Sequence, residues 1–221
     1  MPRTRVKICG LMRAEDARTA AQAGADALGV ILAPGHRRSL TSKEAADVFA
    51  GAPEGIERVG VFVDAPLDEA VDAVQRAGLT EVQLHGSESP AYCAAVRTGG
   101  VAPVRVVKTF HVGAGFKARA IERYRGRVDA ILLDTQVEGA VGGTGRSFDW
   151  ALVEQVPAIA PVYLAGGLTP ENVRDAVTQV RPEGVDVSSG VEQAAGSKSD
   201  EKMQRFVAEV RAADREIEEQ Q

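Results

Sequence analysis

Short β-branched runs alternate with segments of helical periodicity along the chain, and eight such pairs can be counted. A strand followed by a helix, repeated many times, is typical of a parallel sheet covered by helices. Eight units in 221 residues are close to the lower size of a closed barrel. An open doubly wound sheet usually has fewer strands and a dinucleotide fingerprint after the first, but this first strand ends in CGLMR. The pattern therefore predicts an α/β fold, a minimal (βα)8 TIM barrel.

The expected strands are evenly spaced, and a helical stretch is expected after each of them. Helix boundaries agree with this spacing: Ser42 begins a segment with Glu44 in its first turn, Thr169 caps a start at Pro170, and Gly78 ends a helix. The strands are expected at residues 5–9, 27–32, 58–64, 81–85, 104–109, 130–134, 162–165 and 184–187.

Domain organisation follows from the same series, because neither a linker nor a low-complexity tract interrupts it. With 44% hydrophobic residues, a chain of this length can bury one sizeable core. We therefore expect a single (βα)8-barrel domain over residues 1–221. The charged segment 214–221 is expected to fray or to extend the last helix into solvent.

Charge and cysteine content limit the partners. A formal charge of -5 gives no broad basic surface, so neither nucleic acid nor an anionic membrane is expected as a partner. No apolar run is long enough to span a membrane, and the N-terminus leads directly into a strand, so we expect a cytoplasmic protein. Cys9 and Cys93 do not have metal-ligand spacing, which predicts reduced thiols and no metal site.

Residues at the C-terminal ends of barrel strands form the active-site face of this fold. Side chains alternate along a strand, so Cys9 and Lys7 should share one face in the barrel interior, as should Gln83 and His85. Asp134 should lie at the lip of the sixth strand. A ring of polar groups at one end indicates a ligand-facing mouth, because buried polar groups need partners.

Each cysteine and the aspartate also has a structural alternative. Cys9 is equally explained as a small buried hydrophobe, and its position alone does not decide. Cys93 lies on an apolar helical stripe and is expected in the core. Asp134 would be a common turn residue, but the long glycine-rich loop after it, TQVEGAVGGTGRSFDW, favours a functional role.

Two adjacent strand ends carry glycine and serine motifs that predict a phosphate site. LAGGLTPENV follows the seventh strand and VDVSSGVE follows the eighth. Backbone amides and hydroxyls there can converge on an anion, as is usual in this fold. The GGTG segment around Gly143 lacks a P-loop ending and is interpreted as a flexible flap or an auxiliary part of this cradle. The expected cradle residues are Gly166, Gly167, Ser188, Ser189 and Gly190.

A pair of arginines, Arg37 and Arg38, follows the second strand in PGHRR. Arginine binds carboxylates through two parallel hydrogen bonds, so this pair could hold a substrate carboxylate beside the mouth. Surface arginines are also often simply solvated. Both alternatives remain open at this point.

These motifs together resemble the phosphoribosylanthranilate isomerase family along nearly the whole chain. The matching segments, in order, are VKICG, GADALGV, VGVFVD, VQLHG, ILLDT, GGTGRSFDW, LAGGLTPENV and DVSSGVE. The resemblance implies Cys9 as general base, Asp134 as general acid and Arg38 as the contact for the anthranilate carboxylate. Met12 and His36 depart from the common pattern, so Arg37 remains a rival for that contact.

The resemblance implies an Amadori rearrangement of N-(5-phosphoribosyl)anthranilate in tryptophan biosynthesis, without cofactor. Asp134 would protonate the ribose ring oxygen, and the Cys9 thiolate would then take the C2 proton. Lys7 is expected to favour the thiolate, and a partly desolvated site to keep Asp134 protonated. The ligand is then a small phosphosugar, and the protein is either a monomer or a homodimer.

Three alternatives compete with this function. The histidine-pathway isomerase performs the same rearrangement but needs a second anion cradle, and the loops after strands three and four have no comparable glycine pair. A synthase of the same pathway needs a lysine acid, for which Lys108 is the candidate. The third alternative is a barrel that binds phosphate without catalysis. The joint presence of Cys9 and Asp134 argues against it.

Overall fold

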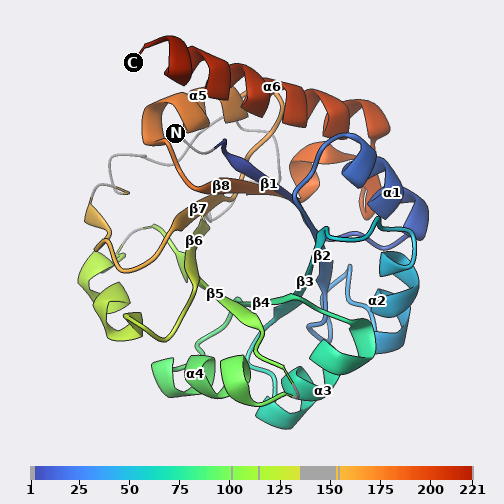
Figure 1. Ribbon diagram of the computed structural model, residues 1–221, viewed down its shortest axis with the longest axis vertical. Helices are drawn as coiled ribbons and strands as arrows, with labels where there is room; N and C mark the ends of the chain where they lie inside the picture. Colours follow the sequence, from blue (N-terminus) through green and yellow to red (C-terminus); the bar gives the residue numbers. More distant parts are fainter. Residues whose placement is uncertain (1–2, 101, 114, 135–152, 154, 221) are drawn as a thin grey trace.

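Eight parallel strands form a closed barrel in the computed structural model, which describes residues 3–100, 102–113, 115–134, 153 and 155–220. Each strand pairs with the next one in the chain, and β1 pairs with β8 to close the ring (Figure 1). The predicted (βα)8 barrel is therefore confirmed. The strands are β1 (Arg5–Ile8), β2 (Ala27–Ile31), β3 (Glu57–Phe62), β4 (Glu81–Leu84), β5 (Arg105–His111), β6 (Ala130–Asp134), β7 (Val162–Ala165) and β8 (Gly184–Val187).

Helices form a ring outside the barrel (Figure 1). They are α1 (Ala14–Gln22), α2 (Ser42–Phe49), α3 (Leu67–Ala77), α4 (Pro90–Thr98), the 3-10 helix η1 (Ala118–Tyr124), α5 (Val173–Val180) and α6 (Asp200–Glu219). A helical stretch was expected after each strand, and the type of helix varies. The element after β5 is a 3-10 helix whose N-cap residue, Lys117, makes no side-chain cap. The helix expected after β6 lies largely outside the described residues.

The last unit also differs from the simple repeat. After β8 the chain forms a short 3-10 turn, η3 (Ser189–Val191), and a two-stranded hairpin of β9 (Glu192–Ala194) and β10 (Ser197–Lys198) before α6 begins. The hairpin therefore lies directly beyond the predicted SSG phosphate motif. It supplies two charged side chains to the site, described below.

The predicted helix boundaries are correct at α2 and α3. Thr41 caps α2 in a full capping box with Glu44, so the helix begins at Ser42. Gly78 ends α3 in the left-handed conformation, with φ of 62°. The start predicted at Thr169 is wrong by several residues, because a turn comes first and α5 begins at Val173.

The core has two layers that follow the alternation of side chains along the strands. Ile8, Ile131 and Leu133 belong to the larger cluster between the barrel and the helices, as expected. The interior of the barrel holds a second cluster that includes Ala130 and Leu132. Alternation therefore assigned the two faces of β6 correctly.

Of the two outcomes expected for the C-terminal segment, its described part shows the second: it extends α6, as far as Glu219. Ile217 is buried, and the Asp214 carboxylate accepts a hydrogen bond from the backbone N–H of Thr4 at 3.1 Å. α6 runs beside α5 and α1, across the region where β8 meets β1 (Figure 1). None of the described helices has both the length and the apolar character needed to cross a membrane.

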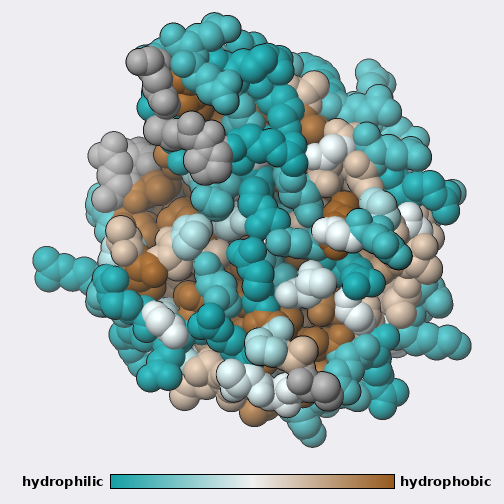
Figure 2. All heavy atoms as spheres, viewed as in Figure 1, coloured by the Kyte–Doolittle hydropathy of each residue, from teal (hydrophilic) through white to brown (hydrophobic). Residues whose placement is uncertain are grey.

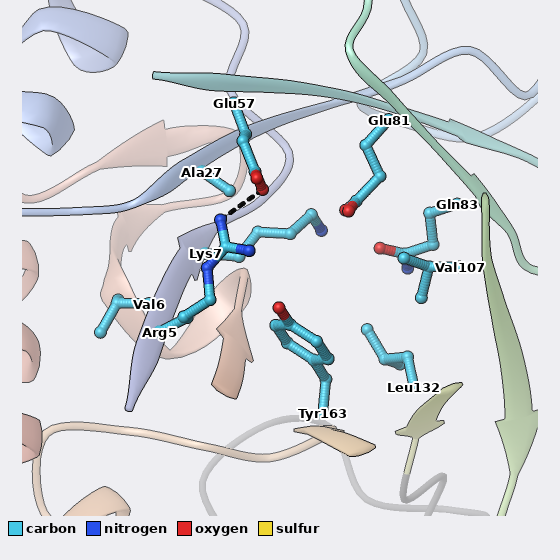
Figure 3. Close-up of a pocket in the computed structure, with 10 residues that line it drawn as sticks. All are labelled: Arg5, Val6, Lys7, Ala27, Glu57, Glu81, Gln83, Val107, Leu132 and Tyr163. Carbon is cyan, nitrogen blue, oxygen red and sulfur yellow. Dashed lines mark ion pairs between the residues drawn. The ribbon is translucent and has the colours of Figure 1, made fainter. Parts of the chain in front are cut away.

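The N-terminal end of the barrel is filled by charged and aromatic side chains. Arg5 and Glu57 form an ion pair at 2.5 Å, while Tyr163 and Glu81 extend from other strands into the same space (Figure 3). The cavity left among these residues measures only about 10 Å³. Down the barrel axis, hydrophilic residues occupy the middle of the visible face (Figure 2). A ligand of sugar phosphate size therefore has to bind at the opposite end, where the strands terminate.

Candidate active site

Lys7 and Cys9 lie side by side in the barrel interior. A Cβ atom added to Gly29 of the neighbouring strand would lie 2.9 Å from the Cys9 sulfur and 3.1 Å from the Lys7 ammonium nitrogen. Both side chains therefore pass over the same glycine, as the shared-face prediction requires. Glycine is needed at position 29 because any larger residue would displace one of the two groups.

Lys7 is paired with Asp186, its direct partner across the β1–β8 ladder. The Lys7 ammonium donates to the Asp186 carboxylate at 2.9 Å, and both side chains are buried. Burial alone would lower the pKa of Lys7, but the adjacent carboxylate outweighs this and the pKa is raised. Sequence reasoning missed Asp186, although a polar residue inside the apolar strand GVDV is a visible signal.

Cys9 is held as a thiol. Burial raises the pKa of the Cys9 thiol, and the nearby Lys7 ammonium lowers it only in part. The expectation that Lys7 favours the thiolate is therefore correct in direction, yet burial is the larger effect. Cys93 is fully buried in the core, as predicted, and burial raises its pKa to about 11.

Asp134 and His85 meet at the C-terminal rim of the barrel. His85 Nε2 lies 3.0 Å from an oxygen of Asp134, and His85 Nδ1 lies 3.1 Å from the side-chain nitrogen of Gln83. If the Gln83 amide donates to Nδ1, the imidazole is neutral and its Nε2–H donates to Asp134. The chain of Gln83, His85 and Asp134 thus connects the buried interior of β4 to the lip of β6. The Asp134 side chain is 20% exposed.

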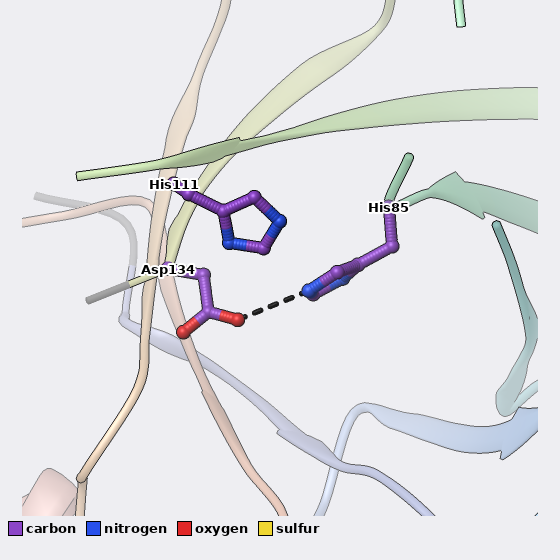
Figure 4. A group of neighbouring side chains, drawn as sticks. All are labelled: His85, His111 and Asp134. Atoms are coloured by element: carbon purple, nitrogen blue, oxygen red, sulfur yellow. Dashed lines mark hydrogen bonds and ion pairs between the residues drawn. The ribbon is translucent and has the colours of Figure 1, made fainter. Parts of the chain in front are cut away.

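His111, at the end of β5, completes a cluster that sequence reasoning did not identify. It is the direct partner of Asp134 across the β5–β6 ladder, and its ring lies edge-on to that of His85, with centroids 5.0 Å apart (Figure 4). One ligand atom from each of His85, His111 and Asp134 lies within 4.8 Å of the other two. Imidazole and carboxylate groups at this spacing are potential metal ligands.

The loops after β7 and β8 come into contact, as a shared anion cradle requires. Gly166 and Gly167 both have positive φ, 83° and 65°. A Cβ atom on Gly190 would lie 1.9 Å from the carbonyl oxygen of Leu168, so only glycine allows the two loops to approach this closely. The Ser188 hydroxyl is buried, and it has no hydrogen-bond partner among the described residues. Ser189 is exposed beside it, while Gly143 lies outside the described residues.

Arg38 is buried and forms a close ion pair, whereas Arg37 is exposed and reaches the same carboxylate, that of Glu192, only at 3.9 Å. Its Nε and one terminal nitrogen donate to the two carboxylate oxygens of Glu192 at 2.6 and 2.9 Å. Lys198, also buried, lies 3.4 Å from Glu192 and donates to the Ser188 carbonyl at 2.9 Å. Arg38 is therefore fixed next to the β8 loop, whereas the Arg37 side chain is 58% exposed. Sequence reasoning missed Glu192 and Lys198.

Lys108 is absent from the mouth. It is buried on the helix-facing side of β5, where it pairs with Glu88 at 3.1 Å and donates to the carbonyls of Leu84 and Gly86. Through these contacts the Lys108 ammonium stabilises the loop after β4. The synthase alternative, which needs a lysine acid at the mouth, therefore loses its candidate.

The site thus brings a carboxyl and a thiol to the same end of the barrel, since Cys9 follows β1 and Asp134 ends β6 in a parallel sheet. The two contacting loops, after β7 and β8, complete this rim. Such an arrangement can move protons to and from a ligand whose anionic group is bound by backbone amides.

Comparisons with known proteins agree with this geometry. Residues 6–209 match the family model described as N-(5'phosphoribosyl)anthranilate (PRA) isomerase. N-(5'-phosphoribosyl)anthranilate isomerase from Magnetococcus marinus is 43% identical, covering 95% of this chain and 96% of the relative. The crystal structure of phosphoribosyl anthranilate isomerase from Thermus thermophilus is 36% identical, with a TM-score of 0.82 over 95% of this chain and 99% of that one.

A second solved structure carries a ligand. It is phosphoribosyl anthranilate isomerase in complex with reduced 1-(o-carboxyphenylamino)-1-deoxyribulose 5-phosphate, 34% identical, with a TM-score of 0.79 over 95% of this chain and 99% of that one. The matches extend over nearly the full length of this chain and of each compared protein, and they include the fold as well as the sequence. The chain belongs to the N-(5'-phosphoribosyl)anthranilate isomerase family.

Proposed function

We propose that this chain converts N-(5-phosphoribosyl)anthranilate to 1-(2-carboxyphenylamino)-1-deoxyribulose 5-phosphate, an aldose–ketose isomerisation in tryptophan biosynthesis, with Cys9 as base and Asp134 as acid. The observation that carries the proposal is the common rim of the barrel: Asp134 ends β6, Cys9 follows β1, and the two strands between them in the ring, β7 and β8, carry the contacting loops. Family membership supports the same reaction.

The acid step opens the ribose ring. Asp134 donates its proton to the ring oxygen, the bond from C1 to that oxygen breaks, and the nitrogen lone pair forms a protonated Schiff base. The Asp134 carboxylate that remains accepts the hydrogen bond from His85 Nε2, 3.0 Å away. His85 thus stabilises the acid after it has given up its proton, and Gln83 holds the imidazole in the orientation that this requires.

The base step moves the proton from C2. Cys9 is a thiol before the reaction because burial raises its pKa. The protonated Schiff base is a cation, and a cation close to a thiol favours the thiolate. The thiol releases its proton to solvent as the cation forms, and the thiolate then takes the C2 proton, which leaves an enolamine that tautomerises to the ketone. Lys7 adds positive charge on the same side, although Asp186 neutralises much of it.

Substrate binding is assigned to two parts of the rim: the loops after β7 and β8, which bind the phosphate, and Arg38, which binds the carboxylate. Amides around Gly166, Gly167, Ser189 and Gly190 receive the phosphate, together with the Ser188 hydroxyl, which has no hydrogen-bond partner within the described part of the chain. Arg38 receives the anthranilate carboxylate through its terminal nitrogen NH1, because Glu192 occupies only Nε and NH2. Arg37 remains the rival, and the assignment of Gly143 to a flexible flap or an auxiliary part of the cradle stays a prediction.

The direct test uses the fluorescence of phosphoribosylanthranilate. Adding the purified protein is expected to remove this fluorescence as the substrate is converted. Persistent fluorescence despite binding would favour a barrel that only holds phosphosugars. The histidine-pathway substrate, with phosphates at both ends, is expected to remain unconverted in a parallel assay. The oligomeric state, monomer or homodimer, is a separate prediction that sedimentation can decide.

A further inference from the structure

Three neighbouring strands each end in a side chain able to ligate a metal ion. His85 follows β4, His111 ends β5 and Asp134 ends β6, so the three groups project from consecutive positions on the rim (Figure 4). Their ligand atoms all lie within 4.8 Å of one another, and the shortest separation, between His85 Nε2 and an oxygen of Asp134, is 3.0 Å. Nothing in the proposed reaction uses His111.

The spacing is close to that of a coordination sphere. Ligands bound about 2.1 Å from one zinc ion, at angles of about 90–110°, lie roughly 3.0–3.4 Å apart. The pair His85 and Asp134 already meets this distance. The exposed His111 ring has to move by at most about 1.5 Å to complete the triangle, and no hydrogen bond restrains that ring among the described residues.

The ligand set selects a class of metal. Two imidazoles and one carboxylate suit zinc and similar transition metals, whereas magnesium and calcium prefer oxygen ligands alone. Catalytic zinc sites commonly have three protein ligands of this kind and leave a fourth position open for water. His85 and Asp134 are 24% and 20% exposed, so solvent can reach that position.

Gln83 supports the site from beneath. A histidine bound to metal through Nε2 carries its proton on Nδ1 and needs an acceptor there. The Gln83 amide already lies 3.1 Å from Nδ1, and rotation about its last bond presents the carbonyl oxygen in place of the nitrogen. The buried Gln83 side chain can thus satisfy His85 in both states.

We propose that His85, His111 and Asp134 bind one zinc ion, and that the bound ion inhibits the enzyme. The inhibition rests on the proposed function: an Asp134 carboxylate bound to zinc cannot carry the proton for ring opening, and the ion occupies space beside the substrate. No metal site was expected from the sequence, because that expectation rested only on the spacing of the cysteines. These three ligands are separated along the chain and meet only when the barrel closes.

Calorimetric titration of the EDTA-treated protein with zinc chloride tests the binding. The wild type is expected to bind one zinc ion, and His111→Ala to bind it at least about tenfold more weakly. His36→Ala, which alters the only remaining histidine, is the matched control and should bind as the wild type does. Cys9→Ala should also retain binding, and magnesium chloride should give no heat of binding. Equal zinc affinity in His111→Ala and the wild type would overturn the proposal.

Isomerase assays test the inhibition separately. Zinc is expected to inhibit the wild type and EDTA to restore it, while His111→Ala keeps its basal turnover and resists zinc. Inhibition by zinc that persists unchanged in His111→Ala would contradict the proposal. If that inhibition disappears in Cys93→Ala, the zinc acts on a thiol. If the wild type lacks isomerase activity, the calorimetry still decides the metal site. If it is active but binds no zinc at this cluster, only the metal site fails.

Discussion

His85 Nε2 and an oxygen of Asp134 lie 3.0 Å apart at the rim of the barrel, although 49 residues separate them in the sequence. Gln83, two residues before His85, fixes the other side of the imidazole. The contact means that the proposed acid is oriented by its neighbours on β4. It also means that the acid has a hydrogen-bond donor ready to stabilise it once its proton has been transferred.

Replacing His85 should therefore reduce turnover more than substrate binding. We expect His85→Ala to lower kcat by about 10–100-fold, because a misoriented acid loses productive geometry, while KM changes little. Steady-state kinetics of the variant checks this. Gln83→Leu, which removes only the support of the imidazole, should show a smaller loss of the same kind. An effect confined to KM in His85→Ala would assign His85 to binding alone.

Arg38 should contribute to both stability and substrate binding. Arg38→Ala leaves Glu192 buried without its main partner, which costs about 3–5 kcal/mol for pairs of this type; the remaining Lys198 contact should keep the loss near the lower end. Chemical denaturation measures the loss. KM should rise if the guanidinium holds the substrate carboxylate. Arg37→Ala is the matched control, and a larger rise in KM there than in Arg38→Ala would transfer the carboxylate contact to Arg37.

Glu81 should make stability decrease as the pH rises from about 4.5 to about 7. Burial, with help from nearby Glu57, raises the pKa of Glu81 from 4.5 to about 7. In this window the folded state binds more protons than the unfolded state, so the free energy of unfolding falls with increasing pH, by on the order of 2–3 kcal/mol. Denaturation at a series of pH values should show this slope.

The slope should be absent from Glu81→Gln, which keeps the size of the side chain but does not ionise. Glu54→Gln alters an exposed carboxyl and should retain the slope of the wild type. A wild-type slope in Glu81→Gln would show that the pH dependence comes from another group.

Cys9 should react slowly with alkylating reagents at neutral pH. Burial raises the pKa of its thiol, and only the thiolate is nucleophilic. In a Cys93→Ala background, alkylation followed by mass spectrometry should therefore be slow at neutral pH and accelerate as the solution is made alkaline. Fast labelling at pH 6, at a rate that does not change with pH, would mean that the Lys7 ammonium lowers the pKa of the Cys9 thiol by more than burial raises it.

The features that sequence predicted are those that depend on local periodicity. Alternation along β1 places Lys7 and Cys9 on one face, and alternation along β6 separates Leu132 from Ile131, because both follow from the geometry of a single strand. The glycine motifs after β7 and β8 were likewise visible, because the close approach of Gly190 to Leu168 tolerates no side chain.

The features that sequence missed depend on how distant elements meet. Arg38 pairs with Glu192 across 154 positions of the chain, and nothing near either residue predicts that contact. His111 could not be assigned to the site from the sequence, because only the pairing of β5 with β6 places it opposite Asp134. Lys108 kept the synthase alternative open because the strand end alone did not show that its side chain turns toward Glu88 and the helices.

The central claim is that Cys9 and Asp134 act on the same sugar from two sides of the barrel mouth. Turnover of phosphoribosylanthranilate by Cys9→Ala and Asp134→Asn, each checked for native circular dichroism and melting temperature, tests this most directly. We predict that either change lowers kcat by about 10²–10⁴-fold while the fold is retained. Turnover close to that of the wild type in either variant would contradict the account.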